Sequence, residues 1–99
     1  MIEISRIVGF EWDGGNARKN DKHHVLPAEA EQVFFDPRLL LVDDIRHSGT
    51  EPRYQALGCT EIERLLHVTF TLRNDSTLIR VISARDASRK ERKWYEGQT

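Results

Sequence analysis

The chain has 99 residues and a formal net charge of −1, with 31% charged against 38% hydrophobic residues. This length suits one domain over residues 1–99 and leaves no room for two hydrophobic cores. No apolar run approaches the roughly 20 residues of a membrane-spanning helix, and no signal peptide opens the chain, so we expect a cytoplasmic protein. The lone Cys59 excludes an internal disulfide and a cysteine-based metal cluster.

The first half of the chain predicts a strand, two helices and a second strand. Residues 4–12 are apolar and aromatic enough for the first strand, and Asp13 can cap a polar helix that runs towards His23. Residues 39–42 predict a buried strand. The second helix begins at Pro27 and carries an apolar stripe at helical spacing: Ala30, Val33 and Phe34.

The second half predicts further strands and a last helix. Residues 53–59 form one strand, and strict alternation over residues 66–73 predicts another, which pairs with residues 78–84 across a polar loop. Ser88, with Glu91 three residues later, is a capping box that opens a C-terminal helix. We therefore expect an α+β fold, with a mostly antiparallel four-stranded sheet, two N-terminal helices and a C-terminal helix.

The loop at residues 47–53 combines side chains suited to cleaving RNA without a metal. Such cleavage needs a base for the 2′-hydroxyl, an acid for the leaving oxygen and a cation for the phosphoryl oxygens. Glu51 or a histidine such as His47 is the candidate base, a histidine the acid, and Arg53 the cation. The alternative is a surface ion pair between Glu51 and Arg53, worth at most about 1 kcal/mol.

Two arginines lie on the last predicted strand. With a period of two residues, Arg80 and Arg85 point to opposite faces of the sheet unless a β-bulge intervenes. Arg85 leads into the basic helix and is the better phosphate ligand, because its planar fork binds a phosphate in bidentate fashion. Alternatively, both arginines only solvate a sheet edge.

The C-terminal helix combines basic and aromatic residues in the way that single-stranded RNA-binding surfaces do. Arg89 and Arg92 are candidates for the RNA backbone, as is Lys22 in the N-terminal half, and Tyr95 is a candidate for stacking on a base. The alternative is that Trp94 or Tyr95 anchors the helix to the sheet.

The histidines do not suggest a metal site. No pair of them is spaced four residues apart, as two ligands on one helical face would be, and Cys59 has no partner thiol. We therefore expect neither a metal nor another cofactor.

Taken together, the motifs resemble the BrnT family of toxins. Phe10 to Asp13 resembles an FxWD opening, and residues 22–25 resemble a KHGV segment, in which either His23 or His24 matches the family histidine. Gly14 departs from the proline often found there. Further matches are Val33-Phe34 with Asp36-Pro37 (VFxDP), residues 47–53 (HSxxExR), Gly58, and residues 80–85 (RIISAR).

The resemblance implies a RelE-like fold and a metal-independent endoribonuclease that stalls translation. It also implies a BrnA-type antitoxin with a ribbon-helix-helix half, a dimer of toxin–antitoxin heterodimers, and DNA contact only through the antitoxin. We predict that the sheet gathers Arg53, Arg85 and Glu51 around one phosphate, with a histidine, His23, His24 or His47, nearby. The alternatives are a non-catalytic RNA- or protein-binding module, and a degenerate toxin that acts only as a co-repressor.

Overall fold

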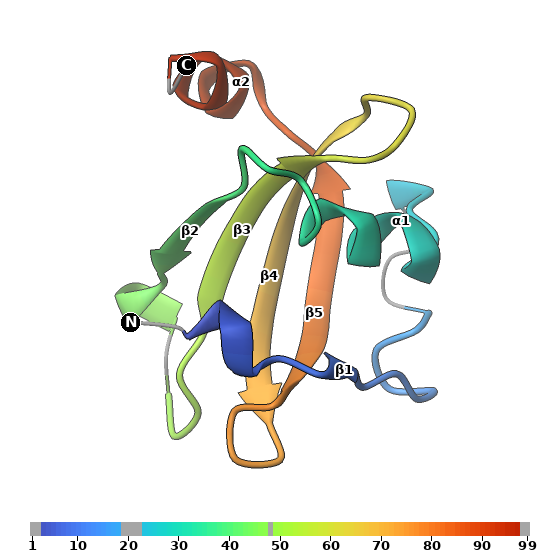
Figure 1. Cartoon of the computed structure of the whole chain (residues 1–99), viewed down its shortest axis with the longest axis vertical. Helices are drawn as coiled ribbons and strands as arrows, with labels where there is room; N and C mark the ends of the chain where they lie inside the picture. Colours follow the sequence, from blue (N-terminus) through green and yellow to red (C-terminus); the bar gives the residue numbers. More distant parts are fainter. Residues whose placement is uncertain (1–2, 19–22, 48, 98–99) are drawn as a thin grey trace.

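A five-stranded sheet organises the molecule (Figure 1). The computed structural model describes residues 3–18, 23–47 and 49–97. The strands are ordered β1-β5-β4-β3-β2 across the sheet. Their bounds are β1 (Gly9–Phe10), β2 (Leu40–Asp43), β3 (Tyr54–Cys59), β4 (Leu65–Arg73) and β5 (Leu78–Asp86). The helices are α1 (Pro27–Val33) and α2 (Arg89–Glu96), with 3-10 turns η1 (Ile4–Arg6) and η3 (Ile45–His47).

The sheet is mixed, which corrects the expected four antiparallel strands. β2, β3, β4 and β5 are antiparallel to one another in turn, but β1 adds a fifth strand parallel to β5. The strand predicted over residues 4–12 shortens to Gly9–Phe10 because residues 4–6 form η1. The backbone N–H groups of Val8 and Glu11 extend the contact by donating to Thr77 and Ile79 of the β5 segment.

The N-terminal helix expected after Asp13 is also corrected. Residues 14–18 form turns, and the Asp13 carboxylate accepts a hydrogen bond from the Gly15 N–H at 2.7 Å. Asp13 therefore closes a tight turn rather than capping a helix. Residues 19–22, where the rest of that helix was expected, lie outside the described residues, so α1 is the only α-helix described ahead of β2.

One face of the sheet carries the main core and is covered by α1. The alternation predicted for β4 is confirmed, because Leu66, Val68 and Phe70 are fully buried there. Ala30 and Val33 of α1 pack against them. The remaining buried members of this cluster are Val25, Ala56, Ile79, Val81 and Ala84.

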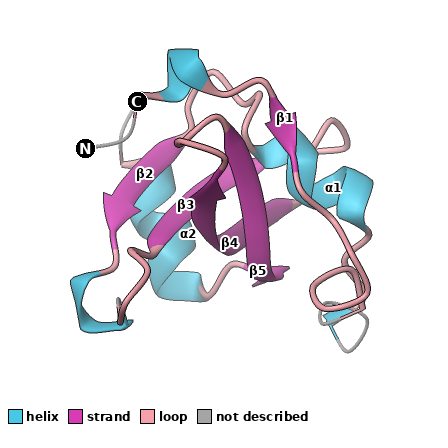
Figure 2. Cartoon of the chain, turned by 90° about the horizontal axis from the view of Figure 1, so that it is seen from below, coloured by secondary structure: helices cyan, strands magenta, loops and turns pink. Residues whose placement is uncertain are grey.

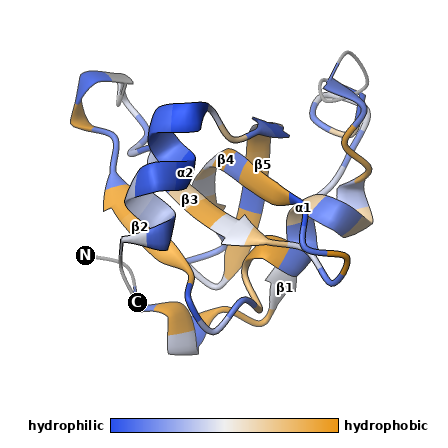
Figure 3. Cartoon of the chain, turned by 90° about the horizontal axis from the view of Figure 1, so that it is seen from above, coloured by the Kyte–Doolittle hydropathy of each residue, from blue (hydrophilic) through white to orange (hydrophobic). Residues whose placement is uncertain are grey.

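The opposite face is covered at one end by α2, so the two helices lie on different sides of the sheet (Figure 2). The predicted capping box is confirmed, with reciprocal hydrogen bonds between Ser88 and Glu91. Tyr95 is buried against Leu57 and Leu65, and its hydroxyl donates to the Asp36 carboxylate. The outer surface of α2 is strongly hydrophilic (Figure 3). Among the described residues, no helix is long and apolar enough to span a bilayer.

Candidate functional site

A β-bulge in β5 brings Arg80 and Arg85 to the same face of the sheet. Arg80 pairs with Thr71 and Arg85 with His67, two residues of β4 that are four apart and therefore share a face. The register shifts between Thr69 and Phe70, which leaves Ile82 of β5 as the extra residue. The β-bulge that the sequence pattern left open is therefore present, and it places the two arginines on one face.

Arg53 and Arg85 line the same pocket on the face that carries α2. The pocket has a volume of about 310 Å³, and its lining is mostly polar. It is lined by Asp44, Arg53, Gln55, His67, Thr69, Ile82, Ser83 and Arg85. Two guanidinium groups on one pocket can hold an anion such as a phosphate.

Arg85 is held in place by Glu91 of α2. Its Nη1 and Nη2 donate to the two carboxylate oxygens of Glu91 at 2.8 and 2.9 Å, and Nη1 also donates to the Asp86 carbonyl. These bonds raise the pKa of Arg85 and, in turn, lower the pKa of Glu91 to about 2. Both members of the pair are therefore ionised at neutral pH.

His67 is the histidine that lines this pocket, and it is not among the site residues predicted from the sequence. Its Nε2 lies 3.2 Å from Gln55 Oε1 and 3.8 Å from Glu91 Oε2. Burial lowers the pKa of His67, and the positive charge of Arg85 lowers it further, against the opposing pull of Glu91. The sequence feature that could have identified His67 is its place on the polar face of an alternating strand, opposite the buried leucine, valine and phenylalanine side chains.

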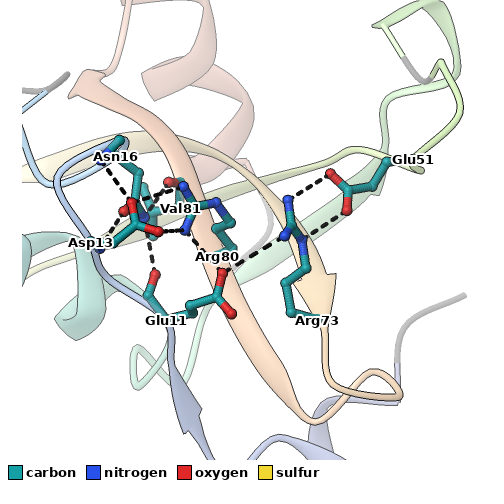
Figure 4. Close-up of polar contacts among 8 residues, drawn as sticks. Glu11, Asp13, Asn16, Glu51, Arg73, Arg80 and Val81 are labelled. Atoms are coloured by element: carbon teal, nitrogen blue, oxygen red, sulfur yellow. Dashed lines mark hydrogen bonds and ion pairs between the residues drawn. The ribbon is translucent and has the colours of Figure 1, made fainter.

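Glu51 belongs to a chain of ion pairs beside the pocket rather than to its lining. Arg73 places Nε 2.8 Å from Glu51 Oε2 and Nη2 3.1 Å from Oε1, and it also lies 3.9 Å from Glu11. Arg80 bridges Glu11 at 2.9 Å and Asp13 at 3.0 Å. Figure 4 shows this alternation of acidic and basic side chains from Glu51 to Asp13. Arg80 is therefore engaged with two carboxylates and does not line the pocket.

The other predicted site residues either do not line the pocket or fall outside the residues that the structure describes. The backbone carbonyl of His23 accepts a hydrogen bond from Arg64, and His23 is not part of the pocket lining. Arg89 and Arg92 are exposed on α2. Lys22 and the side chain of His47 fall outside what the structure describes.

The expected stacking role of Tyr95 requires a correction. Tyr95 is only 5% exposed, on the side of α2 that faces the sheet. The guanidinium carbon of Arg38 lies 4.8 Å from its ring centroid, so no face of the ring is open to a base. The exposed aromatic residue of this helix is Trp94, at 45%. The alternative in which an aromatic residue anchors the helix therefore holds for Tyr95.

Within the ranges 3–18, 23–47 and 49–97, no three His, Cys, Asp or Glu side chains are grouped closely enough to hold a metal ion.

The fold and the pocket define the class of this protein as an α+β domain whose half-covered sheet places two arginines in one polar pocket. The family model described as "Ribonuclease toxin, BrnT, of type II toxin-antitoxin system" matches residues 12–91. The chain belongs to this family, and the match includes both pocket arginines. No curated protein matches the chain.

Proposed function

We propose that this chain is a metal-independent endoribonuclease toxin that inhibits translation by cleaving RNA. The observation that carries the proposal is that Arg53 and Arg85 line one polar pocket on an open sheet face. Family membership supports the ribonuclease activity and the existence of an antitoxin. We further propose one RelE-like toxin domain over residues 1–99, working in the cytoplasm.

In the proposed reaction, the ribose 2′-hydroxyl attacks the adjacent phosphorus. The P–O5′ bond breaks, and the products are a 2′,3′-cyclic phosphate and a 5′-hydroxyl. Arg53 and Arg85 hold the phosphate and stabilise the charge that develops on its oxygens. Glu51, His47 and His23 are the candidates for moving protons.

The proposed partner is a BrnA-type antitoxin with a ribbon-helix-helix half. In this proposal the two proteins form a dimer of heterodimers, and the toxin reaches DNA only through its antitoxin. We propose that RNA contacts outside the pocket are made by Lys22, Arg80, Arg89 and Arg92.

Cleavage of a labelled single-stranded RNA by the purified chain, with and without EDTA, tests this function. We expect cleavage in both conditions and a 2′,3′-cyclic phosphate on the product. Arg53→Ala and Arg85→Ala should each lower the rate by roughly 100-fold or more, because each removes a cation from the reacting phosphate. Arg6→Ala is the matched control, since it removes an equal charge from a residue outside the pocket lining, whose Nη2 donates to the Asp75 carbonyl.

Two outcomes would contradict the proposal. Complete loss of cleavage in EDTA would exclude a metal-independent reaction. RNA binding without any cleavage, together with harmless expression in a bacterial host, would favour a non-catalytic binding module or a degenerate toxin instead.

A further inference from the structure

His67 lines the same pocket as the two arginines, and nothing in the family description gives it a role. In the antiparallel pairing of β4 with β5, His67 lies directly opposite Arg85. Its Nε2 lies near Gln55, which also lines the pocket, and near Glu91 of α2. We propose that His67 is the general acid of this site, donating its Nε2 proton to the leaving 5′-oxygen. This inference rests on the proposed ribonuclease function.

The orientation of Gln55 determines where the imidazole carries its proton. The amide nitrogen of Gln55 donates to the Asp44 carboxylate at 3.1 Å, and a carboxylate can only accept. Gln55 Oε1 is thereby turned towards His67, 3.2 Å from Nε2, and it too can only accept. Nε2 therefore carries a hydrogen in this arrangement, and in the imidazolium form this is the proton that an acid would donate.

The charged groups around His67 make its protonation responsive to a bound phosphate. Glu91 from α2 and Asp44 from the end of β2 favour the imidazolium, whereas Arg85 from β5 and burial among the strands oppose it and lower its pKa. Arg53 also lines the pocket. A phosphate placed on the two arginines adds a negative charge near Nε2, so substrate binding itself favours the protonated acid.

The proposed step balances without any further cofactor. The 2′-oxygen forms a bond to phosphorus as the P–O5′ bond breaks, and the Nε2 proton moves to O5′. The 2′-hydroxyl proton passes to one of the candidates proposed above, Glu51, His47 or His23, and from there to water. His67 ends the step as neutral imidazole and is reprotonated from solvent.

A substrate whose leaving group needs no proton tests the role directly. We would compare single-turnover cleavage of an RNA with that of the same RNA carrying sulfur in place of the bridging 5′-oxygen. A thiol, with a pKa of about 8.5, leaves as a thiolate without help, whereas an alkoxide does not. His67→Gln should slow cleavage of the ordinary RNA by roughly 100-fold or more, and that of the sulfur-containing RNA by less than about threefold.

Two further measurements separate an acid from a structural residue. The wild-type kcat/KM, which reports the pKa of the free enzyme, should fall as the pH rises through a value below the ordinary 6.5 of histidine, and His67→Gln should lose this dependence. His67→Ala should regain activity when imidazole is added to the buffer. His23→Gln and His47→Gln serve as matched histidine variants, and any defect they show should be equal on the two substrates.

An equal defect of His67→Gln on both substrates, or no defect, would overturn the inference while leaving the ribonuclease function standing. Absence of cleavage by the wild-type chain would overturn the proposed function itself, and this inference with it. Thermal unfolding of each variant shows whether a lost activity reflects a lost fold.

Discussion

Glu91 of α2 occupies the guanidinium fork of Arg85 through two hydrogen bonds of 2.8 and 2.9 Å. A phosphate that uses the same Nη1 and Nη2 atoms must displace this carboxylate. Glu91 also bonds the Ser88 N–H at 2.8 Å, so it caps α2 and restrains Arg85 at once. The helix that partly covers the sheet therefore carries an internal competitor for the proposed substrate.

Neutralising Glu91 should strengthen RNA binding. In Glu91→Gln the side chain keeps an oxygen for the Ser88 N–H but loses the charge that competes for Arg85, and we expect about fivefold tighter binding. Fluorescence anisotropy with an uncleavable 2′-O-methyl RNA measures the dissociation constant. Glu96→Gln makes the same charge change on the same helix, 3.9 Å from Arg92, and an equal gain in that variant would show that only net charge matters.

The same carboxylate makes stability depend on pH. Hydrogen bonds from Arg85 lower the pKa of Glu91 to about 2 in the folded state, from the usual 4.5. Its stabilising effect is therefore complete above the unfolded value of 4.5 and is lost as the pH falls towards 2. Because Arg85 is 40% exposed, solvent screening limits this effect to about 1 kcal/mol.

Urea unfolding followed by circular dichroism tests this pH dependence. At pH 7, Glu91→Gln should unfold with about 1 kcal/mol less free energy than the wild type, and the difference should vanish near pH 2. A difference that stays constant across this range would mean that the Glu91 charge contributes nothing.

Gly58 should not tolerate a side chain. A Cβ at this position of β3 would lie 2.8 Å from the Val33 carbonyl oxygen and 3.0 Å from its Cγ1, so α1 would have to move away from the sheet. We expect Gly58→Ala to lower the free energy of unfolding by roughly 2 kcal/mol. Gly14→Ala is the matched control, because nothing lies within 4 Å of the added carbon, and equal losses in the two variants would contradict this account.

Asn16 should be a structural requirement for the segment that follows β1. It is 2% exposed, donates to the carbonyls of Glu11 at 3.0 Å and Val81 at 2.9 Å, and accepts from the Asp13 N–H at 2.8 Å (Figure 4). Asn16→Ala leaves these groups without their partner and should cost about 3 kcal/mol in urea unfolding.

A second variant at this position separates the hydrogen bonds from mere bulk. Asn16→Asp keeps the acceptor for the Asp13 N–H but faces two carbonyl oxygens with a carboxylate, so it should be no more stable than Asn16→Ala. Wild-type stability in either variant would exclude the bonding role.

Local patterns predicted those parts of the fold that depend on neighbours in the chain. The alternation over residues 66–73 identified β4 and its buried face, and the Ser88 capping box identified the start of α2. Both succeed because period-two burial and helix capping act within a few residues. The match of residues 12–91 to the BrnT family follows from the sequence as well.

Other features depend on contacts between distant segments and could not be predicted. The parallel pairing of β1 with β5 joins residues about 70 positions apart. Tyr95 anchors α2 because its hydroxyl donates a hydrogen bond to the carboxylate of Asp36, a residue 59 positions earlier in the chain. His67 entered the candidate site only when the strand register placed it beside Arg85.

By itself, the sequence determined the family, the α+β class and the arginines, glutamate and histidines from which a site can be built. Only the tertiary structure decided which of them meet. One extra residue at Ile82 reverses the alternation of β5 and turns Arg85 towards the pocket of Arg53. A bulge is set by how two strands pair, and that pairing energy is not contained in either strand alone.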